Sequence, residues 1–490
     1  MNLSKSRYCN GIQCKKMLWL EQNKPDAKEE INNDSILEQG NMIHEVARYL
    51  FGNHINISYT ENLKEMIKDT YRTIESYKNV IITEASFNFD FNFCSVDILK
   101  KSNNTYEIYE VKSSTELKDI YIKDTSYQYY VLTSLGFKVT KCFLVHLNNK
   151  YVRKGNLDLN KLFIKEDITN EVINCQKEVK DNINSINKYM EQETEPIDDI
   201  DNKCFKPYPC PFFKYCTRNI PKQNIFNIAN MRNSTKIKLY KEGIYTYEDL
   251  LKEDINDNHK QQIEFELYDK EDYIDKQKLK EFLEELSYPL YFLDFETFQM
   301  PIPLYDNISP YQQIPFQYSL HIIKKENGEL LHKEFLADSG IDPRRKLAEH
   351  LVKDIPKNVC TLAYNMSFEK RVIKYLAELY PDLSNHLMNI YENIKDLMIP
   401  FQKKYYYSKN MFGFYSIKYV LPALFPKEED LNYHNLDLIH NGSEAMNSYA
   451  NLDNLSKEEK EYTRERLLKY CELDTYAMVK IYQKIIDIVK

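Results

Sequence analysis

In the N-terminal half, an acidic residue and an amine stand two positions apart, as Glu110 and Lys112, in a segment with the composition of a β-strand. Residues two apart on a strand point to the same face, and Asp97, on the preceding predicted strand, could share it. Two carboxylates can hold Mg²⁺ or Mn²⁺, while the lysine orients and deprotonates water or stabilises a charged phosphoryl transition state. The pattern therefore suits hydrolysis. It also fits an exposed cross-strand ion pair, because Glu-x-Lys is common.

A second group of acids lies in the C-terminal half. Asp294 and Glu296 end an apolar predicted strand and share one face, which is a simple way to bind divalent cations. Tyr470 and Asp474 stand four residues apart on a predicted helix, so a hydroxyl lies beside a carboxylate. Glu369 lies between these segments, where a predicted strand enters a helix. Each motif alone is also typical of a capped strand or a solvated helix face.

Three cysteines lie close together in a proline-rich segment, as Cys204, Cys210 and Cys216. The prolines suit a turn-rich loop that wraps around a metal centre. Three cysteines cannot complete a Cys₄ site, so a fourth ligand must come from elsewhere in the chain. Most of the other cysteines read as ordinary core residues, namely Cys94, Cys142, Cys175, Cys360 and Cys471.

Strand and helix patterns alternate around both groups of acids. In the N-terminal half we expect a helix over 36–51, β-rich segments over 80–112, a helix over 120–135, a strand over 139–147 and a polar helix over 170–192. A second α/β pattern begins at Tyr288, with an apolar strand over 290–293, and continues to the C-terminus. The pattern predicts two α/β domains.

The composition sets the class of protein. A chain of 490 residues with 43% hydrophobic and 29% charged residues should form two to four globular units. The sequence contains no apolar run of the ~20 residues that a membrane span needs, and its first residues lack the apolar core of a signal peptide. We therefore expect a cytoplasmic protein with reduced cysteines and no membrane partner. A net charge of −8 argues against a broadly basic surface, although metal-ion nucleases can confine positive charge to a groove.

The order of motifs in the first half resembles the RecB-like branch of the PD-(D/E)xK nucleases, which includes CRISPR-adaptation exonucleases. That order is a helical histidine, an Asp, Glu-x-Lys, and then a helix with Gln and Tyr. The resemblance spans residues 1–220 and implies that His44, Asp97 and Glu110 bind metal, that Lys112 is catalytic, and that Gln128 supports the site. The family's second helical motif residue would be Tyr at position 132, where this chain has leucine.

The same branch of nucleases joins a distant N-terminal cysteine to three C-terminal ones around a [4Fe–4S] cluster. The segment from Cys14 to Trp19 resembles the part that supplies this fourth ligand. The resemblance therefore implies a cluster held by Cys14, Cys204, Cys210 and Cys216, with Cys9 as the alternative to Cys14. The five-residue gap between Cys204 and Cys210 is wider than usual in the family, and Zn²⁺ is the alternative occupant. The expected role is structural: the centre would link residue 14 to residue 216 rather than transfer electrons.

The motifs of the second half resemble the DnaQ-like, or DEDD, exonucleases, over about residues 288–490. The resemblance implies a ribonuclease-H-like fold in which Asp294, Glu296, Glu369 and Asp474 hold two Mg²⁺ or Mn²⁺ ions. Tyr470 would orient the attacking water, and digestion would run 3′–5′. The third acid is normally Asp, so Asp396 is an alternative to Glu369. This half also resembles a bacterial domain of unknown function that is found fused behind RecB-like nucleases.

Two further segments suggest contact with nucleic acid. Residues 233–275 read as short helices around a glycine turn, which could present backbone amides to a phosphate or serve as a plain linker. Residues 403–409 interleave lysines and tyrosines, which suits stacking of unpaired bases but equally suits an exposed hairpin tip.

Taken together, we expect an α/β protein with a RecB-like PD-(D/E)xK nuclease domain and a ribonuclease-H-like exonuclease domain. The expected boundaries are 1–220 for the first, 221–285 for a small helical region of helix-hairpin-helix type, and 286–490 for the second. The expected function is metal-dependent degradation of nucleic acid, with single-stranded DNA ends favoured over RNA, in repair or defence against foreign DNA. The alternatives are an RNA exonuclease and a nucleic-acid-binding scaffold in which one or both sites are inactive.

Overall fold

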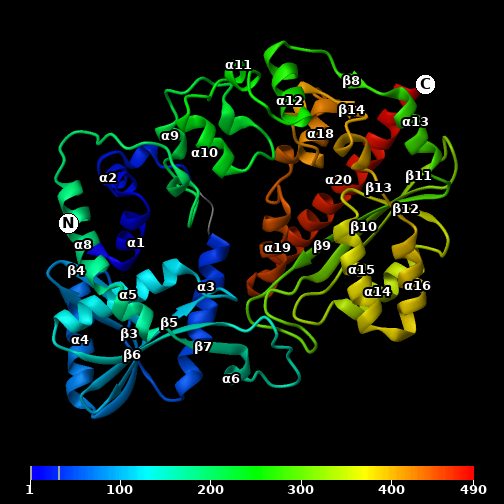
Figure 1. The fold of residues 1–490 in the computed structure, drawn as a ribbon. Coiled ribbons are helices and arrows are strands. Elements are labelled where there is room, and N and C mark those ends of the chain that lie inside the picture. The colour runs from blue at the N-terminus through cyan, green and yellow to red at the C-terminus, as the bar shows by residue number, and fades with distance from the viewer. Residues whose placement is uncertain (1–2, 31–33) are drawn as a thin grey trace. The chain divides into compact units, whose positions relative to one another are not determined.

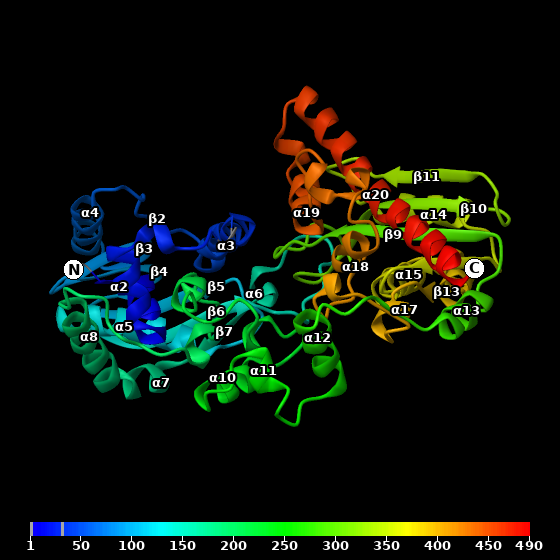
Figure 2. The same ribbon diagram turned by 90° about the horizontal axis from the view of Figure 1, so that it is seen from above.

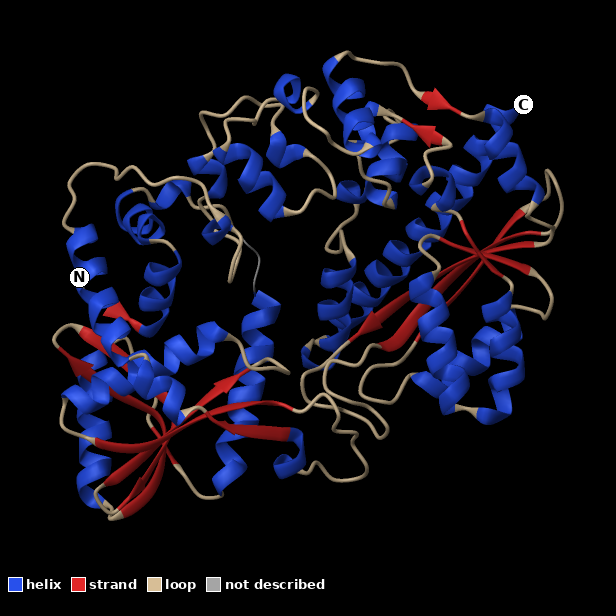
Figure 3. Cartoon of the chain, viewed as in Figure 1, coloured by secondary structure: helices blue, strands red, loops and turns tan. Residues whose placement is uncertain are grey.

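The computed structural model describes residues 3–30 and 34–490 and has a mixed α/β fold (Figures 1 and 3). The chain divides into two compact units. The first comprises Met1–Ile220 with Met300–Gln312, and the second comprises Pro221–Gln299 with Gln313–Lys490. The helical region expected over 221–285 thus falls in the second unit, and its status as a separate domain stays a prediction.

A single mixed sheet carries the first unit. Its strands lie in the order β2-β3-β4-β5-β6-β7, and β1 pairs with β4. Strand β4 pairs antiparallel with both β3 and β5, whereas β5 and β6 run parallel. The bounds are β1 (Leu3–Ser4), β2 (Ile55–Asn56), β3 (Asn79–Phe89), β4 (Asn92–Ser102), β5 (Thr105–Lys112), β6 (Lys138–Leu147) and β7 (Phe163–Asp167). The parallel connection needs a crossover helix, which α5 (Asp119–Ser134) provides.

The helices of the first unit pack on this sheet through apolar stripes. In α4 (Leu63–Ser76), Met66, Thr70 and Ile74 recur every four residues and are buried against β3. Helix α5 covers β3, β4 and β6, and it is itself covered by α1 and α8. The other helices are α1 (Lys5–Gln13), α2 (Lys15–Asn23), α3 (Asp34–Ala47), α6 (Leu159–Leu162), α7 (Thr169–Asn174), α8 (Gln176–Met190) and α9 (Phe213–Cys216). Helix α3 continues as a 3₁₀ turn over Arg48–Phe51.

The segment Met300–Gln312 belongs to the first unit although the strands on either side of it belong to the second. Arg153 holds it by donating from Nη1 to the carbonyl oxygens of Pro303 and Leu304, both at 2.8 Å. Tyr311 donates its hydroxyl to the carbonyl oxygen of Ser113 at 2.9 Å. Nothing in the local sequence pattern indicated this placement.

The second unit is built on a sheet in the order β11-β10-β9-β12-β13 (Figure 2). Strand β9 is central, antiparallel to β10 and parallel to β12, and β11 and β13 form the edges. The bounds are β9 (Leu290–Phe298), β10 (Ile314–Ile323), β11 (Leu330–Leu336), β12 (Cys360–Ala363) and β13 (Ile394–Asp396). A separate small sheet pairs β8 (Tyr273–Ile274) with β14 (Tyr406–Tyr407).

Alternation along β9 decides which helices cover each face. Leu290 and Phe292 pack in the cluster that contains α20 (Lys457–Val489), whereas Tyr291, Leu293 and Phe295 pack against α14–α16. The even-numbered positions of β9 therefore face the C-terminal helix. The three helices on the opposite face are α14 (Arg344–Asp354), α15 (Ser367–Leu379) and α16 (Pro381–Glu392).

Short helices complete the second unit. Its N-terminal part has a small core of its own, built on α10 (Asn233–Lys241), α11 (Tyr247–Leu250) and α12 (Asp257–Leu267). Gly243 ends α10 with a φ of 82°, a conformation that glycine adopts without strain. The remaining helices are α13 (Lys276–Glu284), α17 (Ile399–Gln402), α18 (Ile417–Leu424) and α19 (Gly442–Ala450).

Within the described residues, none of the helices combines the length and apolar character required to cross a membrane.

Candidate functional site

Two neighbouring strands bring the first pair of acids together. The register pairs Ile98 with Tyr109, so Asp97 on β4 and Glu110 on β5 stand opposite each other. Both are buried, with exposed fractions of 5% and 0%. Two carboxylates in such a place need cations or donors close by, because burial without a partner is costly.

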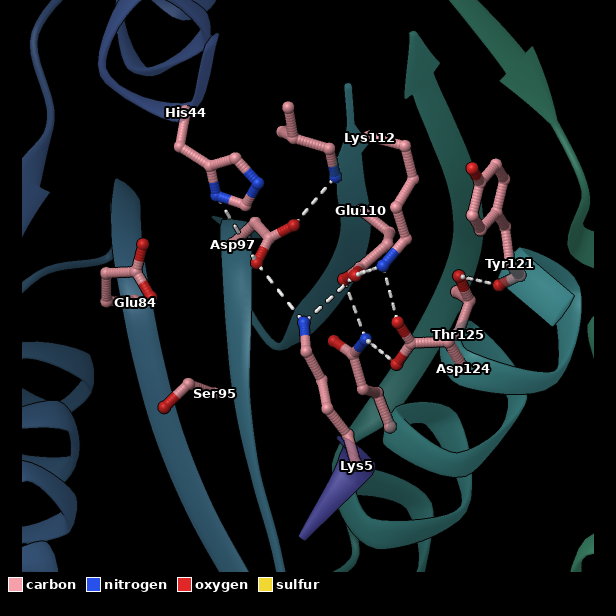
Figure 4. A network of polar contacts seen from close by, with 12 residues as sticks. Lys5, His44, Glu84, Ser95, Asp97, Glu110, Lys112, Tyr121, Asp124 and Thr125 are labelled. Carbon is pink, nitrogen blue, oxygen red and sulfur yellow. Dashed lines mark hydrogen bonds and ion pairs between the residues drawn. The ribbon is translucent and has the colours of Figure 1, made fainter. Parts of the chain in front are cut away.

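Lys5 supplies one such cation. Its ammonium donates to Asp97 Oδ1 at 3.3 Å and to Glu110 Oε1 at 2.9 Å, and Figure 4 shows it between the two carboxylates. Burial opposes the charge on Lys5, but the attraction of the two carboxylates raises its pKa well above the usual value. Conversely, Lys5 helps to hold the pKa of Asp97 low against the effect of burial. No pattern in the sequence predicts that Lys5 lies here.

A possible metal-ligand group surrounds Asp97. One ligand atom each from His44, Glu84 and Asp97 lies within 4.8 Å of the others, and His44 Nδ1 is 3.9 Å from Asp97 Oδ1. Glu84 has a φ of 59°, a left-handed conformation that costs a non-glycine residue roughly 1–3 kcal/mol. Such strain clusters at functional sites. Sequence reasoning missed Glu84, although an acid within the apolar run of β3 was a signal for it.

On the other side of Glu110, α5 contributes a polar pair one turn apart. Lys112 donates from Nζ to Glu110 Oε1 at 2.6 Å and to Asp124 Oδ2 at 2.5 Å. Gln128 donates from Nε2 to Glu110 Oε2 at 2.7 Å and to Asp124 Oδ1 at 3.3 Å. Asp124 was not predicted, although its position four residues before Gln128 placed it on the same helix face.

The structure thus gathers the predicted residues His44, Asp97, Glu110, Lys112 and Gln128 around one point. The oxygens of Glu110 accept hydrogen bonds from Lys5, Lys112 and Gln128. The acids that form a possible metal-ligand group with His44 are instead Asp97 and Glu84. The attraction of Asp124 and Glu110 outweighs burial and raises the pKa of Lys112. The amine therefore stays an ammonium, which suits stabilisation of negative charge rather than removal of a proton. Leu132 is fully buried in the core and takes no part.

The second group of acids lies where β9 meets α20. Asp294 and Glu296 occupy even-numbered positions of β9, the face that α20 covers, and Asp474 comes from that helix. One ligand atom from each lies within 4.8 Å of the other two. Burial, and then their mutual repulsion, raise the pKa of Asp294 and of Glu296 well above the usual values, and burial raises the pKa of Asp474 to about 6.

Glu369, in the first turn of α15, is not part of the set within 4.8 Å, but it is near enough for its charge to act on Asp294 and Glu296. It is 2% exposed, and burial raises its pKa to about 8. Its Oε2 is buried without a hydrogen-bond partner among the residues described. Asp396, the alternative, has both carboxylate oxygens engaged, because they accept from the backbone amides of Asn365, Met366 and Met398 at 2.9–3.2 Å. The geometry therefore favours Glu369 as the ligand and gives Asp396 the role of holding the turn before α15.

Two tyrosines and a lysine adjoin the acids. Tyr433 donates its hydroxyl to Asp474 Oδ1 at 2.6 Å, and its ring centroid is 6.1 Å from that of Tyr470. Burial and the charge of Asp474 raise the pKa of Tyr470, so its phenol stays protonated. Lys418 on α18 is near enough for its charge to act on Glu296 and Asp474. Sequence reasoning missed Tyr433 and Lys418, which lie in irregular or weakly patterned segments.

Beside these residues the second unit has a cavity of about 850 Å³, a size at which proteins bind sizeable ligands. Lys418, Phe425, Tyr433, His440 and Asn441 are among the residues that line it. It combines aromatic surface, two lysines, amide groups and three glutamates next to the acids.

The cysteines of the predicted metal centre gather in the first unit. Cys14, Cys204, Cys210 and Cys216 line one common cavity. They are not among the described groups whose ligand atoms come within 4.8 Å of one another. Cys9 instead packs on the main core of the unit, so Cys14 is the fourth member of the cluster.

One prediction about nucleic-acid contact is wrong. In the segment 403–409, Tyr406 and Tyr407 form strand β14, and they are 4% and 1% exposed. They pair with β8 and pack in the core of the second unit, so the segment is no exposed hairpin tip and these two rings cannot stack on bases. Basic and aromatic alternation does not by itself reveal which side chains a sheet buries.

Comparisons with known proteins relate the chain to a domain family and to a protein whose functions are not described. A family model described as "Domain of unknown function (DUF2779)" matches residues 291–416, which include all of β9 after Leu290, together with Glu369 and Asp396. The chain is 24% identical over 465 residues to "Uncharacterized protein MG366" of Mycoplasma genitalium, covering 82% of this chain and 69% of that protein. The chain is thus an α/β protein in which each unit carries a group of residues that could hold a metal ion.

Proposed function

We propose that this protein is a metal-dependent nuclease with two active sites, a RecB-like PD-(D/E)xK site in the first unit and a DnaQ-like site in the second. The observation that carries the proposal is the group Asp294, Glu296, Glu369 and Asp474. Glu296 and Glu369 are buried and Asp294 and Asp474 are partly buried, the pKa of each of the four is raised, and one oxygen of Glu369 has no hydrogen-bond partner among the described residues. Divalent cations would neutralise such a group of acids. All the donors are oxygens, the kind that Mg²⁺ and Mn²⁺ prefer.

The second unit supports a ribonuclease-H-like fold. Its central strand has an antiparallel hairpin on one side and parallel strands on the other, and the C-terminal helix packs across it. Bound divalent ions would clamp a scissile phosphate from both sides. Tyr470, held as a neutral phenol, would orient the attacking water, while Tyr433 fixes the carboxylate of Asp474. Lys418 and the aromatic surface of the adjoining cavity suit a phosphate backbone and unpaired bases.

In the first unit, His44, Glu84 and Asp97 would hold a divalent ion, with Glu110 beside them. The ion would polarise the phosphate and lower the pKa of a bound water. Lys112, kept charged by Glu110 and Asp124, would stabilise the developing negative charge of the phosphoryl group. Gln128 and Asp124 hold Lys112 and Glu110 in position. Lys5 keeps the carboxylate pair neutralised when no ion is bound.

For the cysteines we propose a [4Fe–4S] cluster held by Cys14, Cys204, Cys210 and Cys216. A single Zn²⁺ needs its four thiolates close together, because Zn–S bonds are about 2.3 Å long. A cluster of several irons holds thiolates that lie farther apart, and the four cysteines line one common cavity without forming a set of ligand atoms within 4.8 Å. The centre would tie the N-terminal helices to the segment after α8.

The proposed substrate is nucleic acid, with single-stranded DNA ends favoured, and the proposed setting is cytoplasmic repair or defence against foreign DNA. RNA is the alternative substrate, because two-metal chemistry does not depend on the 2′-hydroxyl. A scaffold without catalytic activity is disfavoured, because the polar residues that each nuclease site requires are present in both units.

The test is degradation of single-stranded DNA and RNA, each labelled at the 5′ or the 3′ end, by anaerobically purified protein with Mg²⁺ or Mn²⁺. Lys112→Ala and Asp294→Asn should each remove a different product pattern. Matched controls on the same units are Lys141→Ala, which loses an exposed ion pair of β6, and Asp338→Asn, which changes an exposed acid. Both controls should cut like the wild type. If the wild type cuts neither substrate, the scaffold takes precedence.

A further inference from the structure

Two histidines face each other on the hairpin of the second unit, outside the acidic group. His321 on β10 pairs directly with His332 on β11. Their ring centroids are 4.5 Å apart and the rings are tilted by 31°. His321 is buried, whereas His332 is partly exposed. The proposed nuclease chemistry uses neither of them.

A chain of hydroxyl groups assigns the protons on these rings. Thr475 donates its only hydroxyl hydrogen to the carbonyl oxygen of Glu472 at 3.1 Å, so its oxygen accepts from Ser319 at 2.6 Å and from His321 Nδ1 at 2.8 Å. Because Ser319 has used its hydrogen, its oxygen accepts from His332 Nε2 at 2.9 Å. His321 therefore carries its proton on Nδ1 and His332 on Nε2.

The other nitrogen of each ring is left with a free lone pair. These are Nε2 of His321 and Nδ1 of His332, and the latter lies 3.8 Å from Glu472 Oε1. A neutral imidazole whose second nitrogen is held by a hydrogen bond is the usual form of a metal-binding histidine. The Ser–Thr pair thus sets both rings in the form that metals bind.

A carboxylate completes the group. Glu472, on the exposed side of α20, has Oε1 at 3.8 Å from His332 Nδ1, and one ligand atom each from His321, His332 and Glu472 lies within 4.8 Å of the others. Glu334 follows His332 by two positions on β11 and so shares its face. The ligands of a tetrahedral zinc ion lie roughly 3.3 Å apart for bonds of about 2.0 Å. Rotation of the exposed Glu472 can bring its carboxylate closer to both imidazoles, and small shifts of the two rings would complete the geometry.

We propose that His321, His332 and Glu472 bind a transition-metal ion of the zinc type. Two imidazoles select zinc and its neighbours over Mg²⁺, so the site would stay chemically distinct from the carboxylate group. The ion would link the β10–β11 hairpin to α20, the helix that carries Tyr470 and Asp474. It would therefore stabilise the position of the helix on which the acidic site depends.

Zinc binding to metal-free, full-length protein tests this directly, by equilibrium dialysis against Zn²⁺ in excess Mg²⁺ and measurement of bound zinc per chain. We expect His332→Asn to bind one zinc fewer than the wild type, and the exposed change Glu472→Gln to weaken the same zinc. Thr475→Val, which removes only the hydroxyl that orients His321, should weaken it by roughly 10–100-fold. The control His350→Asn, at an exposed histidine of the same unit, should match the wild type.

Zinc bound at other sites cancels in these differences, and circular dichroism verifies that each variant is folded. The proposal is overturned if Glu472→Gln, His332→Asn and Thr475→Val all bind zinc with the stoichiometry and affinity of the wild type. Because the readout is bound metal, this result is independent of whether the protein cuts nucleic acid.

Discussion

Glu369 gives a quantitative test of the proposal that the acids of the second unit bind divalent cations. Burial raises its pKa to about 8, so in metal-free protein at pH 6 it is protonated, whereas in the unfolded chain it is ionised. The folded state then binds the extra proton. Stability that depends on this proton is present at low pH and is lost as pH rises through the folded-state pKa.

The size of the effect follows from linkage. Each extra proton bound by the folded state makes stability fall by about 1.4 kcal/mol per pH unit. Between pH 6 and pH 8, Glu369 alone should therefore remove roughly 2 kcal/mol, equivalent to a fall in Tm of roughly 4–8 °C for a unit of this size. Asp294 and Glu296 shift in the same direction and add to it.

The assay is thermal unfolding in EDTA at several pH values, for the wild type and Glu369→Gln. Glutamine imitates the protonated acid, so the variant should melt higher than the wild type at pH 8 and equally at pH 6. Added Mn²⁺ should remove the fall in the wild type and act less on the variant. Glu378→Gln, an exposed change on the same helix, is the control. Parallel curves for wild type and Glu369→Gln would refute the reasoning.

Three further results are expected. Lys5→Met removes the ammonium that Asp97 and Glu110 share and should destabilise the metal-free protein by about 3–5 kcal/mol, with partial recovery in Mn²⁺, measured by denaturant unfolding; an unchanged midpoint contradicts this. Anaerobic protein should be brown, and Cys210→Ser should bleach it while Cys9→Ser does not; a colourless, zinc-loaded wild type rules out the cluster. Tyr433→Phe removes the hydroxyl that donates to Asp474, so the Mn²⁺ concentration needed to stabilise the protein should rise roughly 10–100-fold. A variant that titrates like the wild type would show that this contact is unimportant.

Local patterns predicted the acids that lie on regular strands and helices. Glu110 with Lys112, and Asp294 with Glu296, could be found because alternation along a strand is a property of neighbouring residues. The i, i+4 spacing of Tyr470 and Asp474 is equally local. The α/β class of both halves followed from the same kind of signal.

Residues brought in from elsewhere in the chain could not be predicted in this way. Lys5 reaches Asp97 across 92 positions, and no periodic pattern links them. Glu84 joins the site through a left-handed backbone conformation that strand propensity does not indicate. Tyr433 lies in a short 3₁₀ turn. The packing of 300–312 with the first unit is likewise set by tertiary contacts rather than by composition.

The most direct measurement of the proposed activity is the loss of end-labelled single-stranded DNA in Mn²⁺, compared between the wild type and the double variant Lys112→Ala, Asp294→Asn. Each single change removes one site, so the double variant should retain no metal-dependent cutting while still unfolding as a cooperative protein. Degradation by the double variant at the wild-type rate would show that neither acidic group is an active site.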